Sequence, residues 1–334
     1  MKLNSTKLLF LMMMIISTMI TLSAENWMGM WMGLEINLMS FIPFISKMKS
    51  KNVSQAMMIY FLTQSIGSIL LLFSIILSNM MFISPMMIKE ISIMLVLTSM
   101  LIKLGSAPFH FWLPEMMSNM NWMECSLLLT WQKIAPLSII NNLMFNNWLV
   151  YLCAVLSAFM GAVGGLNQTS LRKIMAYSSI NHLGWMLMFM SMNSSWYKYL
   201  LIYSIMVILA CKFFSLKNIF FINQMSFSSN SLLEKYIFVI LLMSLGGLPP
   251  FLGFLPKWMV IQSMINSNLN IIIILMMLFS LITLFYYLRL VTPLILSYSS
   301  MMKWNYFKSN NIMFLYLIFS INISLPMFSV LSFF

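Results

Sequence analysis

Charged residues are scarce in this sequence. Of its 334 residues only 7% are Asp, Glu, Lys or Arg, whereas a soluble domain carries about 25%. A soluble chain of this length would need a much larger charged surface to stay dispersed. Hydrophobic residues make up 61%, and the mean hydropathy is +0.94. This composition excludes a soluble enzyme and a disordered protein, and it favours a membrane protein with several spanning segments.

Cysteines and acidic residues are also few. The three cysteines, Cys125, Cys153 and Cys211, lie far apart and form no CxxC, so we expect no disulfide, iron–sulfur or zinc site. Six acidic against 18 basic residues give a net charge of +12. In a membrane protein such an excess orients the helices, so we expect no nucleic-acid partner. The sequence also lacks GxGxxG, GxxxxGK and any nucleophile–base or metal-ligand cluster.

The apolar runs predict an all-α polytopic membrane protein with about eleven transmembrane helices, since a span needs about 20 mainly apolar residues. The connections are short, so neighbouring helices should be antiparallel. The first run resembles a signal peptide, but a second follows at once, and we expect the first to be retained. The expected spans are 7–24, 27–46, 55–78, 88–109, 125–143, 148–167, 174–192, 198–221, 235–265, 270–296 and 311–331.

Basic residues gather on one side of this alternating layout. The positive-inside rule then places the N-terminus in the cytoplasm or matrix and the C-terminus on the opposite side. The far side carries Lys89 and Lys198. The basic side carries Lys2, Lys7, Lys47, Lys49, Lys51, Arg172, Lys173, Lys217, Lys235, Lys303 and Lys308.

Ionisable residues inside the spans point to function, because a charge at mid-bilayer costs about 2.5–3.5 kcal/mol. Lys212 and Arg289 lie toward the basic side and fit either snorkelling to the headgroups or function. Four more ionisable residues lie inside the spans: Glu35, Lys103, Lys133 and Lys257. For these four we favour a role in an ion or proton pathway, since desolvated lysine gives up its proton more readily than arginine does.

The three lysines of this group lie beside helix-breaking residues. Lys103 precedes Pro108, Lys133 precedes Pro136, and Lys257 follows the sequence GGLPP at 246–250. Proline removes a helical N–H, and inside a membrane the freed carbonyl must find a protein or water partner. The spans 88–109 and 235–265 are therefore predicted to be broken helices on a hydrated polar path.

The two broken spans resemble each other. Residues 104–114 and 245–256 share a Gly, a Pro-Phe pair and a Leu-Pro pair in the same order, with Gly105 matched to Gly246. A second short match joins 131–136 to 287–293. The matched segments lie five spans apart, which is an odd number, so the repeats would be inverted across the membrane. Chance similarity is the alternative.

We therefore expect one membrane domain over 1–334, with inverted repeats at about 7–143 and 148–296 and a C-terminal helix at 311–331. This register places Lys257 at the position of Glu115, and Arg289 at the position of Lys133.

Two histidines and a glycine pattern within the spans can be explained by structure alone. His110 and His182 are either hydrogen-bonded structural residues or proton relays beside the lysines. Gly161 and Gly165 form a GxxxG pattern, which predicts a close helix contact.

Several motifs resemble the antiporter-like membrane subunits of respiratory complex I (mitochondrial NADH–ubiquinone oxidoreductase), and the resemblance runs from the first span to the last. The composition is similar to that of insect or related invertebrate members. The motifs are WMGLEIN at 31–37, KLGSAPFHFWLPE at 103–115, WQKIAP at 131–136, MAYSSI at 175–180 and GGLPP at 246–250.

This resemblance implies an antiporter-like fold and a proton path through Glu35, Lys103, Lys133 and Lys257, with His110 and His182 as relay candidates. It implies no cofactor on this chain, because other subunits bind NADH, FMN, the iron–sulfur clusters and ubiquinone. The implied partners are other membrane-arm subunits, including neighbouring antiporter-like chains, and the lipid of the mitochondrial inner membrane. The N-terminus would face the matrix and the C-terminus the intermembrane space. A free-standing cation/proton antiporter and a membrane scaffold without a proton path are the alternatives.

Overall fold

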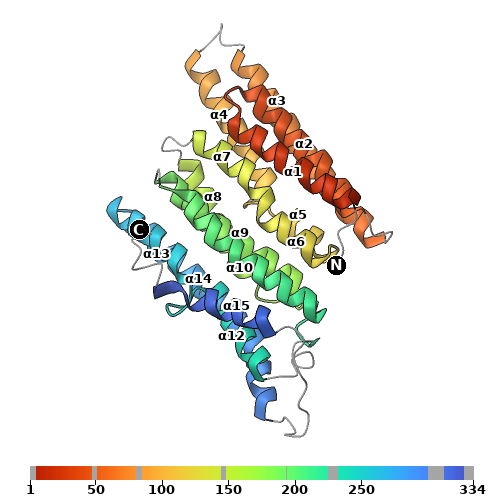
Figure 1. Cartoon of the computed structure of the whole chain (residues 1–334). Coiled ribbons are helices and arrows are strands. Elements are labelled where there is room, and N and C mark those ends of the chain that lie inside the picture. The colour runs from red at the N-terminus through yellow and green to blue at the C-terminus, as the bar shows by residue number, and fades with distance from the viewer. Residues whose placement is uncertain are drawn as a thin grey trace. The chain divides into compact units, whose positions relative to one another are not determined.

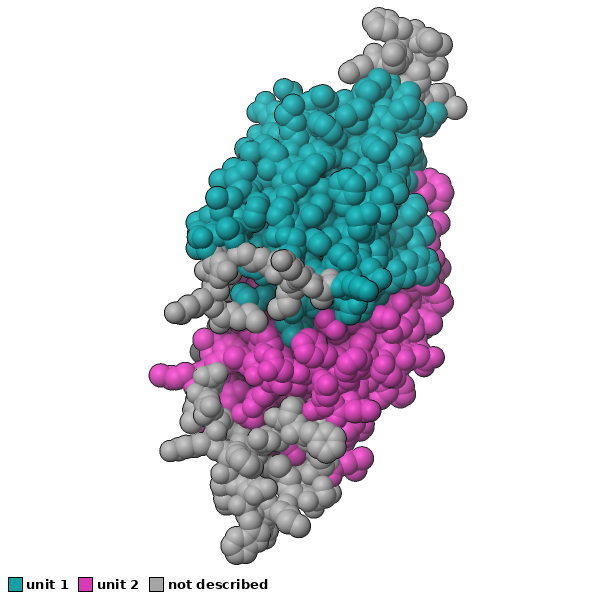
Figure 2. All heavy atoms as spheres, turned by 90° about the vertical axis from the view of Figure 1, so that its right-hand side faces the viewer, with its two compact units in different colours: residues 1–147 teal, residues 148–334 magenta. Residues whose placement is uncertain are grey.

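The computed structural model describes residues 5–46, 51–79, 85–143, 148–192, 194–224, 232–299 and 312–326. These residues form helices and loops with one isolated bridge, between Ser170 and Phe221. The chain divides into two compact units, residues 1–147 and 148–334 (Figure 2). The boundary falls between the two expected repeats, whose inverted relation stays a prediction. Of the orienting basic residues, Lys2, Lys47, Lys49, Lys303 and Lys308 lie outside the described ranges, as do residues 327–331 of the last expected span.

The described residues of unit 1 form helices α1 to α7 (Figure 1). Consecutive helices α1 to α4 pack against one another, and α7 packs against α1 and α4. The elements are α1 (Ser5–Ser23), α2 (Trp27–Ile45), α3 (Lys51–Asn79), α4 (Pro85–Leu104), α5 (Trp112–Ser118), α6 (Trp122–Leu129), the 3-10 turn η1 (Trp131–Lys133) and α7 (Ile134–Leu143).

Unit 2 is built around α9, which is buried along nearly its whole length and contacts α8, α10, α13 and α14 (Figure 1). A helix enclosed by protein on all sides can carry polar side chains inside a membrane, and α9 does so with His182 and Asn181. The elements are α8 (Trp148–Gly164), α9 (Leu171–Ser191), α10 (Trp196–Lys217), α12 (Leu232–Gly246), α13 (Phe254–Asn266), α14 (Asn270–Ser299) and α15 (Ile312–Ile323).

Within the described ranges, each expected span overlaps one helix or a run of shorter helices, while the number of spans stays a prediction. The two broken helices are confirmed: α4 and α5 are separated by residues 105–111, and α12 and α13 by residues 247–253. Among the described residues, five helices are long and apolar enough to cross a membrane: α1, α2, α3, α10 and α14.

The span 125–143 is interrupted as well, which the sequence analysis did not predict. It consists of α6, the 3-10 turn η1 and α7. Pro136 has no N–H for the carbonyl of Gln132, and its ring crowds that carbonyl, so the turn before it tightens. Lys133 therefore lies at a helix interruption, as Lys103 does.

Two ion pairs agree with the antiparallel order of the spans. Lys7 Nζ lies 3.4 Å from Glu124 Oε1 and joins the start of α1 to the start of α6. Lys217 Nζ lies 2.6 Å from a Glu234 carboxylate oxygen and joins the end of α10 to the start of α12. In the alternating layout, both pairs fall on the basic side.

The predicted close contact at Gly161 is confirmed. A Cβ atom there would lie 2.5 Å from the backbone nitrogen of Asn181 and 2.7 Å from the carbonyl oxygen of Tyr177, both in α9. At Gly165, a Cβ would instead meet the ring of Tyr286 at 2.8 Å. The contact between α8 and α9 thus depends on a missing side chain at Gly161.

We expect Gly161→Leu to destabilise the protein by about 1–3 kcal/mol, because the new side chain forces the two helix backbones apart. The matched control is Val163→Leu, on the exposed face of the same helix, with an expected change below about 0.5 kcal/mol. The measurement is the temperature at which the native assembly dissociates in native gels. Equal temperatures for the two variants would contradict the packing argument.

Candidate functional site

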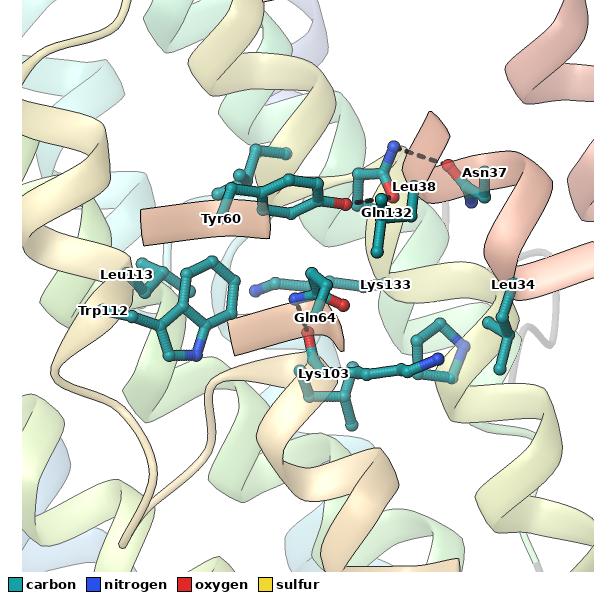
Figure 3. A pocket seen from close by; sticks show the side chains of 13 residues that line it. Leu34, Asn37, Leu38, Tyr60, Gln64, Lys103, Trp112, Leu113, Gln132 and Lys133 are labelled. Carbon is teal, nitrogen blue, oxygen red and sulfur yellow. Dashed lines mark hydrogen bonds between the residues drawn. The ribbon is translucent and has the colours of Figure 1, made fainter. Parts of the chain in front are cut away.

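A small polar cavity lies inside unit 1 (Figure 3). Its volume is about 20 Å³, which is room for a water molecule. Helices α2 to α7 and the turn η1 all contribute to it. The lining residues are Leu34, Asn37, Leu38, Tyr60, Gln64, Lys103, Leu104, Trp112, Leu113, Leu128, Gln132, Lys133 and Pro136.

Two of the expected lysines meet at this cavity. Lys103, in the last turn of α4, is 7% exposed, and Lys133, in η1, is 2% exposed. Figure 3 shows that their side chains extend in opposite directions across the cavity. Gly67 on α3 makes room for the Lys103 side chain, since a Cβ there would lie 3.0 Å from Lys103 Cγ. Both lysines are thus held by packing, away from lipid.

At the helix break beside Lys103, neutral side chains donate hydrogen bonds to the freed backbone carbonyls. Gly105 adopts φ +70°, which turns the chain out of the helix at little steric expense. The carbonyl of Ile102 then accepts a hydrogen bond from the Trp112 indole, and that of Lys103 accepts one from the Gln64 amide, each at 3.2 Å. These donors meet the expectation that carbonyls freed in a membrane find protein partners.

Glu35 lies on α2, close to this cavity but outside its lining. It is half-buried, and its carboxylate interacts electrostatically with Lys103. Within the described residues, the two side chains form no direct salt bridge. The structure therefore brings Glu35, Lys103 and Lys133 into one neighbourhood, with the acid and Lys103 separated.

A hydrogen-bonded string that the sequence analysis missed crosses the same cavity. Gln132 Nε2 donates to Asn37 Oδ1 at 2.8 Å, and the Tyr60 hydroxyl donates to Gln132 Oε1 at 3.3 Å (Figure 3). The available signal was the presence of neutral polar residues within apolar spans, two positions after Glu35 and directly before Lys133. Such side chains are buried in a membrane protein when they bond one another.

At the helix break in unit 2, a lysine side chain donates a hydrogen bond to a freed backbone carbonyl. Gly247 has φ +81°, and Lys257 Nζ donates to the carbonyl oxygen of Gly246 at 2.8 Å. Lys257 is 4% exposed. The carbonyl end of a helix carries a partial negative charge, so the end of α12 holds this ammonium group favourably.

The two breaks have matching backbones. Gly105 and Ser106 both donate to the carbonyl of Leu101, and Gly247 and Leu248 both donate to that of Met243. The sequence match of Gly105 to Gly246 was one residue out of register, because the left-handed residue of the second break is Gly247. Glu115 and Lys257 are each the fourth residue of the following helix, as the sequence register places them.

The histidines have local partners. His110 is buried in the first break, where its Nδ1 lies 3.3 Å from the carbonyl oxygen of Pro108, and it does not line the cavity. His182 is buried in unit 2, with Nδ1 2.8 Å from the Tyr199 hydroxyl and its ring 4.8 Å from that of Tyr203. Their relay role stays a prediction.

The two basic residues left open by the sequence behave differently. Arg289 donates to the carbonyls of Leu166 and Gln168, and so fixes the loop after α8 to α14. Lys212 is exposed one turn before the end of α10, a position that suits snorkelling. In the part of the chain that the structure describes, no group of three or more His, Cys, Asp or Glu residues could hold a metal ion.

A helical membrane protein with two broken helices and buried lysines at the breaks has the features of the ion-translocating class. The profile of the family described as "NADH:quinone oxidoreductase/Mrp antiporter, TM" matches residues 24–283.

Curated relatives narrow this class. The chain is 46% identical over 313 residues to NADH-ubiquinone oxidoreductase chain 2 of Aedes aegypti, covering 91% of each chain. It is 44% identical over 289 residues to that of Locusta migratoria, covering 86% of this chain and 84% of the relative. The Mus musculus relative is 41% identical over 81% of each chain. The chain belongs to the NADH:quinone oxidoreductase/Mrp antiporter membrane family and, within it, to the NADH-ubiquinone oxidoreductase chain 2 proteins.

Solved structures show the same fold at low sequence identity. A chain of respiratory complex I from Thermus thermophilus matches with a TM-score of 0.84 and 20% identity, covering 99% of this chain and 79% of its own length. A chain of the Mrp complex from Dietzia matches with a TM-score of 0.73 and 16% identity, covering 85% of this chain and 59% of its own. Together with the described helices, these likenesses establish the antiporter-like helical fold.

The hydrogen bond from Lys257 to the carbonyl of Gly246 gives a testable prediction about the position of Lys257. In Gly247→Ala, the new Cβ would lie 2.8 Å from Lys257 Nζ at a φ that disfavours alanine, so the ammonium group must move. We expect turnover of the assembled complex to fall about tenfold, because small displacements of a transferring group are costly.

The matched control is Gly246→Ala, whose Cβ would meet its nearest neighbour at 3.6 Å, an ordinary contact. We expect this variant to keep at least about half of the activity. NADH:ubiquinone turnover per assembled complex measures both variants. Equal activities would show that the Lys257 position does not matter.

Proposed function

We propose that this chain translocates protons as an antiporter-like subunit of respiratory complex I, coupled to NADH:ubiquinone electron transfer on other subunits. The observation that carries the proposal is the pair of buried lysines, Lys103 and Lys133, facing one polar cavity next to Glu35. Buried ionisable groups in a membrane are costly and mark ion pathways. A cavity with room for water supplies the connection that proton transfer between them needs.

In this proposal, the separation between Glu35 and Lys103 is the switch. When the two side chains approach, they form an ion pair that favours the charged lysine, and when they part the proton can move on to Lys133. Moving a proton against the membrane potential takes about 2.3 kcal/mol per 100 mV. One pKa unit corresponds to about 1.4 kcal/mol, so modest repositioning of paired charges is of the right size.

Lys257 would exchange a proton with the far side of the membrane or with a neighbouring antiporter-like subunit. Its ammonium group is buried, and the carbonyl end of α12 holds it. His110 and His182 are the proposed relays on this route.

The family supports a proposed setting for the chain. The chain would lie in the mitochondrial inner membrane, among other membrane-arm subunits and lipid, with its N-terminus in the matrix and its C-terminus in the intermembrane space. The ion pairs Lys7–Glu124 and Lys217–Glu234 support the antiparallel layout on which this orientation rests. NADH, FMN, iron–sulfur clusters and ubiquinone would be bound by other subunits, and this chain would carry no cofactor.

Replacing Lys133 tests the proton path. We expect Lys133→Met to lower coupled NADH:ubiquinone turnover about tenfold or more, because a neutral side chain cannot accept a proton at this position. The measurement is turnover and proton release per electron in sealed vesicles. The control is Lys212→Met, on an exposed site, with a change below about twofold. A fully assembled Lys133→Met complex that pumps normally would favour a scaffold without a proton path.

The assembly itself is tested by native electrophoresis of mildly solubilised membranes, with NADH dehydrogenase activity stained in the gel. We expect an antibody against this chain to label the large active band. A chain that runs alone, away from the activity, would favour a free-standing cation/proton antiporter, and transport by the isolated chain would then be measured.

A further inference from the structure

The amide of Gln132 joins three elements that each carry part of the proposed proton path. Gln132 precedes Lys133 in the turn η1. Its Nε2 donates to Asn37 Oδ1 on α2, two residues after Glu35, and its Oε1 accepts from the Tyr60 hydroxyl on α3 (Figure 3). Both ends of one neutral side chain are therefore engaged across the cavity.

Helix α3 links this string to the other lysine. Tyr60 and Gln64 are four residues apart and lie on one face of α3. Gln64 donates to the carbonyl oxygen of Lys103, and Gly67, on the same helix, packs against the Lys103 side chain. A displacement of α3 relative to η1 would therefore strain the Tyr60–Gln132 bond and the contacts that hold Lys103.

The Asn37–Gln132–Tyr60 string can pass on a displacement of one element to another, but it carries no charge. Asn37, Gln132 and Tyr60 are neutral, so their bonds persist whichever lysine carries the proton. Asn37 and Tyr60 are each 3% exposed, so neither group can exchange its partner for bulk water. A shift of α2 that opens or closes the Glu35–Lys103 pair would pull on Gln132 directly.

We propose that Gln132 is a positioning residue that mechanically couples the helix carrying Glu35 to the turn carrying Lys133. This inference rests on the proposed proton path. Through Gln132, a shift of α2 that changes the separation between Glu35 and Lys103 would also displace Lys133.

The test uses the assembled complex in mitochondrial membranes. Gln132→Leu keeps the side-chain bulk and removes the bonds to Asn37 and Tyr60, together with a weak one that Nε2 donates to Met14 Sδ at 3.6 Å. We expect turnover to fall about five- to tenfold. The KM for quinone and the amount of assembled complex should stay unchanged, because the proposed function places quinone binding on other subunits. The matched control is Gln168→Leu, a glutamine of similar burial whose amide bonds the carbonyl of Gly164, with turnover within about twofold of wild type.

A length swap separates positioning from general packing. Gln132→Asn and Asn37→Gln each mismatch the bridge and should lower turnover about threefold or more. The double variant restores the combined length, and we expect at least about half of the wild-type turnover to return. Losses that simply multiply in the double variant would overturn the inference.

Two further measurements keep the test decisive. If Gln132→Leu fails to assemble, Tyr60→Phe removes one hydroxyl with little change in volume, and we expect about a two- to fivefold loss of turnover. Normal turnover in Tyr60→Phe would then overturn the inference.

Lys133→Met is measured in parallel. Loss of pumping in Lys133→Met with normal Gln132 variants overturns the positioning role alone, whereas normal pumping in Lys133→Met overturns the proton path as well.

Discussion

The constraint behind this structure is that a helix broken inside a membrane must find partners for its freed backbone groups. Lipid offers none, so the chain supplies them itself. At the first break, the Trp112 indole and the Gln64 amide bond the carbonyls of Ile102 and Lys103. At the second, the Lys257 ammonium bonds the carbonyl of Gly246. Polar side chains enter the bundle to serve these carbonyls, and the cavity in unit 1 forms among them.

The two breaks share a backbone but differ in the chemistry of the cap. The fourth residue of the following helix is Glu115 in unit 1 and Lys257 in unit 2. A carboxylate cannot donate to a carbonyl, so unit 1 uses neutral donors, and the Lys103 ammonium can face the cavity. In unit 2 the cap is itself ionisable, which ties the charge of Lys257 to the end of α12.

The sequence predicted the two broken helices and the burial of Lys103, Lys133 and Lys257, because apolar length, helix-breaking residues and lysines within apolar runs are strong local signals. It did not predict the interruption at η1, since Pro136 alone does not say whether a helix kinks or tightens. It placed Gly105 opposite Gly246, because residue identity cannot show which of two adjacent glycines takes a positive φ. The Asn37–Gln132–Tyr60 string depends on α2, α3 and the turn η1 meeting, and no short motif carries that information.

The predicted repeat pairs Arg289 with Lys133, and the structure places these two residues in different surroundings. Lys133 lies in an interrupted segment, next to a cavity with room for water. Arg289 lies in the continuous helix α14 and bonds the carbonyls of Leu166 and Gln168. An arginine keeps its proton under all ordinary conditions, so at this position the charge anchors a loop and cannot carry a proton onward. The proposed transfer groups are therefore unequal between the units, with Lys103 and Lys133 in unit 1 and Lys257 in unit 2.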